Sequence, residues 1–290
     1  MSFLTVDFTQ IHYQLLEPKL EEGQTEKPTC VVFLHGFVMD NLSSWFFTLA
    51  NPVAQFTRAL VYDLRGHGFS ARPKTGYGIA THLNDLKELI ENVVGGEKVI
   101  LVGNSYGGLL ALNFASKHPE LVAGLVLIDA QINDEAWKQQ MLSTFSLQGE
   151  ERDRVIIENF DNWLGRRSLR KSRRLEENAK DLLYHTSLMD DLRNESYLVD
   201  NDLHKITVPC FAMYGGESDI LATAHQLETV MPNCHLQIVE GSTHSVLWEQ
   251  TERVKAWIID SIQTLIDESK ETQFLPASSL GPISLEWEIP

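Results

Sequence analysis

Ser105 lies in the sequence GNSYG at 103–107, which matches the pattern Gly-x-Ser-x-Gly. The apolar run 99–102 precedes this pentapeptide, and a stretch typical of a helix follows it. A serine on a tight turn between a strand and a helix presents its hydroxyl above the sheet, and small neighbours leave room for the turn. The pattern therefore predicts a nucleophilic serine.

A serine hydroxyl is a weak nucleophile until a base accepts its proton and a third group orients that base. His244 follows the last expected strand and is the expected base. Asp219 follows the expected strand before it and is the preferred orienting carboxylate. Asp129, which ends another expected strand, and Glu217 remain alternatives. The order Ser, Asp, His along the chain is the one expected of a hydrolase with this type of turn.

Acyl chemistry also needs N–H donors for the negative oxygen that forms in the transition state, and losing one donor costs about 3–4 kcal/mol. We expect one donor to be the N–H of Tyr106, directly after the serine. The other is expected from Phe37, in the loop after the strand 30–34, where Gly36 lets the backbone turn toward the site. His35, in the same loop, is interpreted as structural.

The bulk composition indicates a globular protein without a nucleic-acid partner. Of 290 residues, 43% are hydrophobic and 22% are charged, which is enough apolar sequence for a large core. The net charge of −16 leaves no overall basic field that could attract phosphates. No signal peptide or membrane-spanning run is visible. Three widely spaced cysteines are expected to be reduced and buried, which favours a cytoplasmic location.

Short apolar runs alternate with amphipathic stretches, a pattern that predicts an α/β fold with a doubly wound, mostly parallel sheet. Residues 2–16 are expected to form a hairpin. The expected strands are 30–34, 58–63, 98–102, 121–128, 207–214 and 235–239, and the clearest expected helices are 77–94 and 251–267. The resulting division is a core in two parts (1–130 and 206–270), a helical cap (131–205) and a C-terminal extension (271–290).

The cap segment carries two features of interest. Trp137 and Met141 share a helix face, which either packs the cap or lines the substrate pocket. Six basic residues crowd into 166–174. They form either a solvated helix face or a docking site for an anionic substrate group or an acidic carrier protein.

Several of these motifs together resemble the α/β-hydrolase fold superfamily. The resemblance is carried by the His-Gly step at 35–36, the loop DLRGHG at 63–68, the sequence GNSYGG at 103–108, GESD at 216–219 and GSTH at 241–244. It covers about 30–130 and 205–265, and it implies a serine hydrolase that needs no cofactor or metal. The loop 63–68 resembles a feature that is usually structural in this superfamily.

The turn around the serine is also similar to that of hydrolases that cleave carbon–carbon bonds in dienones. That likeness implies that Asn104 helps to place the substrate. Those enzymes usually carry an aromatic residue after the histidine, where this chain has Ser245. We therefore expect a hydrolase of a small, partly apolar ester or thioester. A carbon–carbon hydrolase is the alternative, and a lyase or a ligand-binding member of the fold is the alternative of another class.

Overall fold

The structure is a computed structural model that describes residues 1–19, 27–38, 40–146 and 169–274. One sheet of eight strands forms its centre, in the order β1-β2-β4-β3-β5-β6-β7-β8. The strands β1 and β2 are antiparallel, as is the pairing of β2 with β4, and all later pairings are parallel. The doubly wound, mostly parallel α/β fold is therefore confirmed.

The strands lie close to their expected positions. Every residue of β3 and β4 is buried, as expected for apolar runs that are covered on both faces. The last two strands start near Pro209 and Asn233, where Cys210 N–H donates to the Asn233 carbonyl at 2.9 Å. The strands are β1 (Ser2–Val6), β2 (Thr9–Leu16), β3 (Cys30–Leu34), β4 (Arg58–Tyr62), β5 (Val99–Asn104), β6 (Val122–Ile128), β7 (Cys210–Gly215) and β8 (Cys234–Val239).

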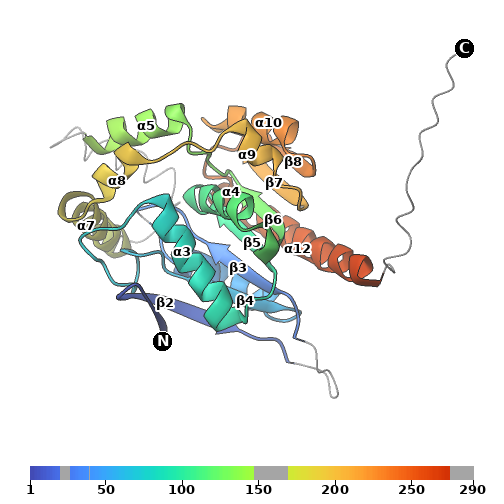
Figure 1. Cartoon of the computed structure of the whole chain (residues 1–290). Helices are drawn as coiled ribbons and strands as arrows, with labels where there is room; N and C mark the ends of the chain where they lie inside the picture. Colours follow the sequence, from blue (N-terminus) through green and yellow to red (C-terminus); the bar gives the residue numbers. More distant parts are fainter. Residues whose placement is uncertain (20–26, 39, 147–168, 275–290) are drawn as a thin grey trace, which may run out of the picture.

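Helices cover both faces of the sheet, and Figure 1 shows α3 and α4 on the near side with α12 behind. On one face, α3 (Ile79–Leu89), its continuation η2 (Ile90–Val94), α4 (Tyr106–Lys117) and α10 (Leu221–Val230) contribute to one core cluster. The second cluster lies on the other face, under α1 (Ser43–Trp45), η1 (Phe46–Ala50), α2 (Asn51–Val53), α11 (Val246–Glu249) and α12 (Thr251–Phe274).

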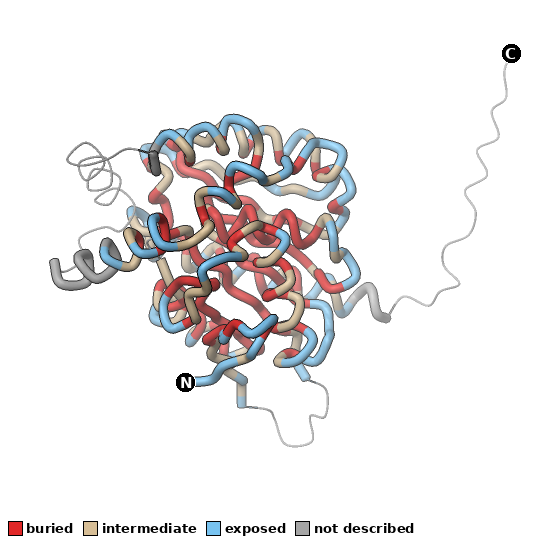
Figure 2. Tube along the Cα trace, turned by 60° about the vertical axis from the view of Figure 1, so that its left-hand side comes forward, coloured by how far each residue is buried: buried red, intermediate tan, exposed pale blue. Residues whose placement is uncertain are grey.

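The amphipathic pattern explains why α12 lies where it does. Val254, Ile258, Ile262 and Leu265 recur at helical spacing and are all buried in the second cluster. The short helix η3 (Pro119–Leu121) links α4 to β6. Figure 2 shows the buried residues gathered in the middle of the molecule, between the helical layers.

Between β6 and β7, the described part of the chain contains helices and no strand. These helices are α5 (Glu135–Ser146), α7 (Leu169–His185), α8 (Leu188–Asn194) and α9 (Asp200–His204), and Figure 1 shows α5, α8 and α9 at the top of the view. Trp137 and Met141 of α5 are buried in the same cluster as Tyr106, so α5 packs directly against the body of the fold. The division of the chain into a core and a cap over 131–205 stays a prediction, and residues 147–168 of that cap lie outside the described residues.

The cysteines are free, and one of them differs from expectation. Cys30 and Cys210 are buried, whereas Cys234 on the edge strand β8 is only partly buried. Burial raises the pKa of Cys30 to about 12, so this thiol stays protonated at neutral pH.

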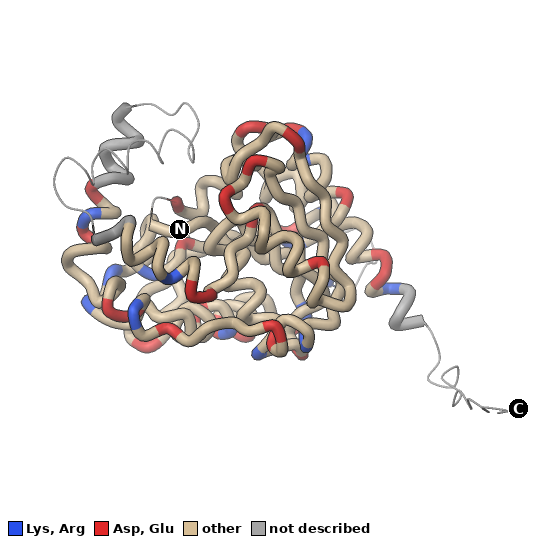
Figure 3. Tube along the Cα trace, turned by 90° about the horizontal axis from the view of Figure 1, so that it is seen from above, with Lys and Arg blue, Asp and Glu red and all other residues tan. Residues whose placement is uncertain are grey.

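Charge is spread over the surface rather than concentrated. Figure 3 shows Asp and Glu positions all around the described body, with Lys and Arg between them. Within the described ranges, no helix is both long and apolar enough to cross a bilayer.

Candidate active site

Ser105 sits at the sharp turn between β5 and α4, in a backbone conformation that few non-glycine residues adopt (φ 53°, ψ −116°). The two glycines of the motif make this turn possible. A Cβ atom on Gly103 would lie 2.5 Å from the Gly107 carbonyl oxygen, and one on Gly107 would lie 2.2 Å from the Leu34 carbonyl oxygen. The strand, turn and helix therefore approach too closely for any side chain at these two positions.

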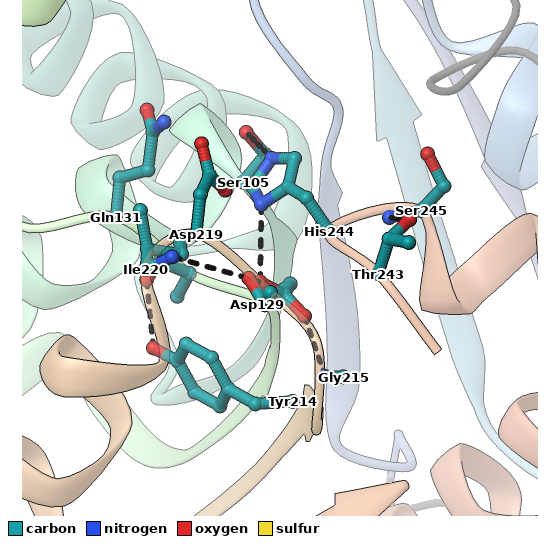
Figure 4. A network of polar contacts seen from close by, with 12 residues as sticks. Ser105, Asp129, Gln131, Tyr214, Gly215, Asp219, Ile220, Thr243, His244 and Ser245 are labelled. Carbon is teal, nitrogen blue, oxygen red and sulfur yellow. Dashed lines mark hydrogen bonds and ion pairs between the residues drawn. The ribbon is translucent and has the colours of Figure 1, made fainter. Parts of the chain in front are cut away.

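His244 lies in the loop after β8 and reaches Ser105 as expected. Its Nε2 atom is 3.0 Å from the Ser105 hydroxyl oxygen, and its Nδ1 atom is 3.0 Å from a carboxylate oxygen of Asp129 (Figure 4). With Nδ1–H donating to this carboxylate, Nε2 is left to accept the serine proton. The three side chains form a continuous chain of hydrogen bonds.

The carboxylate in this chain is Asp129, not the preferred candidate Asp219. Asp129 follows β6 with a left-handed backbone (φ 43°) and has no exposed surface. One of its carboxylate oxygens accepts the Gly215 N–H at 2.8 Å, and the other accepts the Ser218 hydroxyl at 2.5 Å as well as the imidazole. Three donors thus hold a buried carboxylate in place at the imidazole.

Asp219 occupies the outer side of the same turn. Ser218, just before it, points inward to Asp129, and Asp219 is exposed with its Oδ2 3.2 Å from the Gln140 amide nitrogen of α5. The expectation that Asp219 orients His244 is therefore not met in the structure, because the position at Nδ1 is already filled from the neighbouring strand. Glu217, the other alternative, is also exposed.

The charges around His244 favour its protonated form. Burial of the imidazole by itself lowers the pKa of His244, but the hydrogen bond to Asp129 and the negative charges of Asp129 and Asp219 outweigh that effect. The pKa of His244 is consequently raised above its ordinary value. An imidazole of this kind is well suited to hold a proton taken from the serine.

The loop after β3 is fixed by buried histidines, which supports the structural interpretation of His35. The Leu64 N–H donates to His35 Nε2 at 3.0 Å, and the Val38 N–H donates to His67 Nε2 at 2.9 Å. Both imidazoles accept through Nε2 and are therefore neutral. Asp40 adds a third contact, because its Oδ2 accepts the Gly36 N–H at 3.1 Å.

Phe37, in this loop, lies directly against the residue after the nucleophile. The rings of Phe37 and Tyr106 have their centroids 4.1 Å apart. Tyr106 is the first residue of α4, where a helix N–H has no partner within the helix. The two residues expected to supply the oxyanion donors, Phe37 and Tyr106, are therefore neighbours in space. The catalytic role of their N–H groups stays a prediction.

The remaining site candidates gather around the same turn. The Asn104 amide nitrogen lies 3.7 Å from where a Cβ atom on Gly36 would stand, so these two residues are neighbours. Trp137 stacks on Tyr106 with ring centroids 6.3 Å apart. Met141, one turn farther along α5, is buried as well. Substrate binding by these residues stays a prediction.

Sequence reasoning did not select Gln131 or Ser218. Gln131 lies two residues after Asp129, and its N–H donates to the Ser105 carbonyl at 3.2 Å. Its side-chain oxygen accepts the Trp137 indole N–H at 2.6 Å. No sequence motif contains Gln131. It could have been selected only because it follows β6, the strand that pairs with the strand before Ser105.

Two other expectations concern binding groups. Within the described ranges, no cluster of His, Cys, Asp and Glu side chains has the arrangement of a metal site. Of the basic cluster at 166–174, residues 166–168 and the side chains of 169–174 lie outside what the structure describes. Docking of an anionic group or an acidic carrier protein there stays a prediction.

The loop 63–68 is structural, as the resemblance implies. The Asp63 carboxylate is buried and accepts the Leu42 and Phe69 N–H groups at 2.8 and 2.9 Å. Arg65 forms two hydrogen bonds, at 2.7 and 2.6 Å, with the buried carboxylate of Asp85 on α3. These contacts attach the loop to the strand and helix layers rather than to Ser105.

The family model for the alpha/beta hydrolase fold matches residues 29–208. This chain belongs to the α/β-hydrolase fold family. The match begins just before β3 and includes both Ser105 and Asp129. The expectation of a member of this enzyme superfamily is confirmed.

Individual relatives match this chain either over a short stretch or at low sequence identity. An uncharacterized protein of Mycobacterium tuberculosis is 36% identical over 100 residues, which cover 34% of this chain and 28% of that protein. The match to this relative thus spans less than a third of its length. A non-heme chloroperoxidase of Kitasatospora aureofaciens is 23% identical over 241 residues, covering 74% of this chain and 85% of the relative.

Solved structures share the fold at low sequence identity. The enol-lactonase of Burkholderia xenovorans superposes with a TM-score of 0.69 at 18% identity, covering 90% of this chain and all of that one. This likeness covers more of the chain than the family match over residues 29–208.

Proposed function

We propose that this protein is a serine hydrolase that cleaves a carboxylic ester or thioester of a small, partly apolar molecule. The observation that carries the proposal is the chain of hydrogen bonds from Asp129 through His244 to Ser105. A serine that only stabilised the fold would not need an imidazole at its hydroxyl and a buried carboxylate behind that imidazole.

In the proposed reaction, Ser105 attacks the carbonyl carbon while His244 Nε2 takes the hydroxyl proton. Asp129 stabilises the imidazolium that forms. The N–H groups of Phe37 and Tyr106 are the proposed donors to the oxyanion. His244 then gives the proton to the leaving alcohol or thiol. In the second half, His244 activates a water that releases the acid from Ser105.

The apolar side of the site fits a partly apolar acyl group. The rings of Phe37 and Trp137 both contact the ring of Tyr106, with centroids 4.1 and 6.3 Å away. Tyr106 and Trp137 are buried, so the partly exposed Phe37 is the ring of this group that can supply apolar surface near the nucleophile. We therefore assign the specificity for the acyl chain to the loop after β3 together with α5.

The alternatives give different outcomes with the same probes. A fluorophosphonate should add one adduct to the parent protein, measured by intact mass, and none to Ser105→Ala. Kinetics on matched ester, thioester, lactone and dienone substrates then identify the bond. Cleavage of the dienone alone would make this protein a carbon–carbon hydrolase, the candidate that Asn104 suggested. Absence of any adduct would favour a lyase or a ligand-binding role and contradict the proposal.

A second test concerns the roles within the triad. Ser105→Ala and His244→Ala should each lower kcat by roughly 10⁴–10⁶, because the residues act as a unit. Both variants must keep the parent's thermal unfolding midpoint for the comparison to hold. Activity within tenfold of the parent in either variant would show that the assigned roles are wrong.

A further inference from the structure

Asp219 is a second carboxylate close to the catalytic histidine, and the triad does not use it. It is exposed, and its charge is near enough to His244 to raise the pKa of the imidazole. Figure 4 draws it beside Ser105 and His244. We call Asp219, Gln131 and Gln140 the polar rim of the site. The charge of Asp219 therefore acts close to the side chains that are proposed to react.

No cation balances this charge within the described ranges. Among the described residues, the Asp219 carboxylate accepts a hydrogen bond at Oδ2 from the neutral amide of Gln140, at 3.2 Å. None of the ion pairs among the described residues includes Asp219. The Asp219 carboxylate therefore has a second oxygen that can accept a hydrogen bond from a ligand.

Gln131 adds a donor to the same rim. Its side-chain oxygen accepts the Trp137 indole N–H at 2.6 Å, and because an indole only donates, the other terminal atom must be the amino group. Gln131 is 8% exposed, and this amino group has no partner among the described residues. The amino group itself is not fully buried, so it is open to an oxygen of a molecule bound beside the Ser105 turn.

We propose that the polar rim selects substrates that carry a cationic group near the scissile carbonyl, with Asp219 as the group that attracts the cation. Gln131 donates to an oxygen of the same substrate. This inference rests on the hydrolase function proposed above and names its substrate class: esters or thioesters that carry an ammonium group.

The test compares two substrates of the same shape. The p-nitrophenyl ester of 4-(trimethylammonio)butanoic acid carries one positive charge, and the ester of 5,5-dimethylhexanoic acid replaces its nitrogen by carbon. The measured quantity is the kcat/KM of the cationic ester divided by the kcat/KM of the uncharged ester. This ratio is determined for the parent and for each variant. In the parent we expect a ratio above one that decreases as salt is added, because salt screens exposed charges.

Two substitutions should move this ratio in opposite directions. Asp219→Asn removes the charge and should lower the ratio by about fivefold, the size expected for a partly exposed charge pair. Gln131→Glu keeps an oxygen for the Trp137 indole but adds a negative charge, so it should raise the ratio. The matched control is Glu217→Gln, which removes one charge from the same turn but from a residue that does not act on His244.

The inference is overturned if Asp219→Asn leaves the ratio at the parent value. It is equally overturned if Glu217→Gln lowers the ratio as much, because the effect would then come from the overall acidity of the molecule. If the parent cleaves neither ester of this pair and no ester of the wider panel, that result contradicts the hydrolase function instead.

A binding measurement keeps the two proposals separate. Choline and 3,3-dimethylbutan-1-ol have the same shape, and their affinities can be compared by ligand-observed NMR without any turnover. We expect the parent to bind choline more tightly, and Asp219→Asn to remove that preference. Equal affinity of the parent for both compounds would overturn the inference, whether or not the protein hydrolyses esters.

Discussion

At the scale of single residues, the site depends on which carboxylate faces His244. Asp129 is fully buried and receives three hydrogen bonds, including one from the imidazole. Asp219 is exposed and acts on His244 through its charge. These two surroundings give the two aspartates different effects on the reaction.

We predict that Asp129→Asn lowers kcat by about 10³–10⁴, because an amide in this position no longer holds the imidazole in the required tautomer. Asp219→Asn should cost much less with an uncharged ester, since Asp129 still orients His244. Steady-state kinetics of both variants test this. A larger loss for Asp219→Asn than for Asp129→Asn would restore Asp219 as the member of the triad.

The pH dependence of the reaction gives a second residue-scale prediction. A general base works in its neutral form, so kcat/KM should rise as the pH passes the raised pKa of His244. Removing the charge of Asp219 takes away one cause of that raised value. The acidic limb of the profile of Asp219→Asn should therefore move to lower pH, whereas Glu217→Gln should leave it in place. An unchanged limb for Asp219→Asn would show that its charge does not reach the imidazole.

At the scale of elements, the parallel strands explain how much of the site could be predicted. Ser105 and His244 each follow a strand in a recognisable local motif, so each could be found from its own neighbours in the sequence. The choice between Asp129 and Asp219 could not be made in this way, because both follow strands of the same sheet. The choice depends on two features that only the folded chain defines. The Ser218 hydroxyl points to Asp129, and Asp129 itself has a left-handed backbone conformation.

The same reasoning applies to the helices. The apolar spacing predicted α12, although the helix continues to Phe274, beyond the expected end at 267. The contact of α5 with Tyr106 through Trp137 could not be predicted, because the spacing of Trp137 and Met141 fits packing within the cap equally well.

The turn between β5 and α4 yields an element-scale prediction. Gly107→Ala should reduce both the yield of folded protein and the activity at least tenfold, because the new methyl group meets the backbone carbonyl of Leu34 at 2.2 Å. Gly216→Ala is the control, since its Cβ atom would lie 3.1 Å from the Glu240 carboxylate and 3.3 Å from the Glu240 Cα atom, which is a much milder approach. Thermal unfolding and esterase assays measure the difference. Equal tolerance of both substitutions would contradict the close approach.

At the scale of the whole molecule, buried neutral histidines should limit stability in acid. Burial lowers the pKa of His67 to about 3, with the neighbouring His35 adding to the effect, and burial also lowers the pKa of His82 well below 6.5. Between about pH 6.5 and pH 3 the unfolded chain therefore binds protons that the folded chain does not. As the pH falls through this range, the free energy of unfolding should decrease by up to about 1.4 kcal/mol per pH unit for each such histidine.

A matched pair of variants tests this prediction. Neither ring nitrogen of His82 has a hydrogen-bond partner among the described residues, whereas His67 accepts the Val38 N–H. His82→Phe should therefore keep or raise the stability at pH 7 and make the acid dependence shallower. His67→Phe should also make it shallower but lower the stability at pH 7. Urea unfolding from pH 7 to pH 4 measures both effects, and an unchanged acid dependence would contradict the buried, neutral state.

Because Asp129 directly follows β6, two of the three hydrogen-bonded side chains, Ser105 and Asp129, precede the helical segment in the chain, and only His244 follows it. The residues between α5 and α9 could therefore be exchanged as a cassette for the corresponding segment of another family member without replacing any of the three. Chimeras that also exchange α5, which carries Trp137 and Gln140, are expected to keep the proposed triad and to change the proposed substrate selection. The three hydrogen-bonded side chains and the helices from α5 to α9 therefore occupy separate stretches of the sequence.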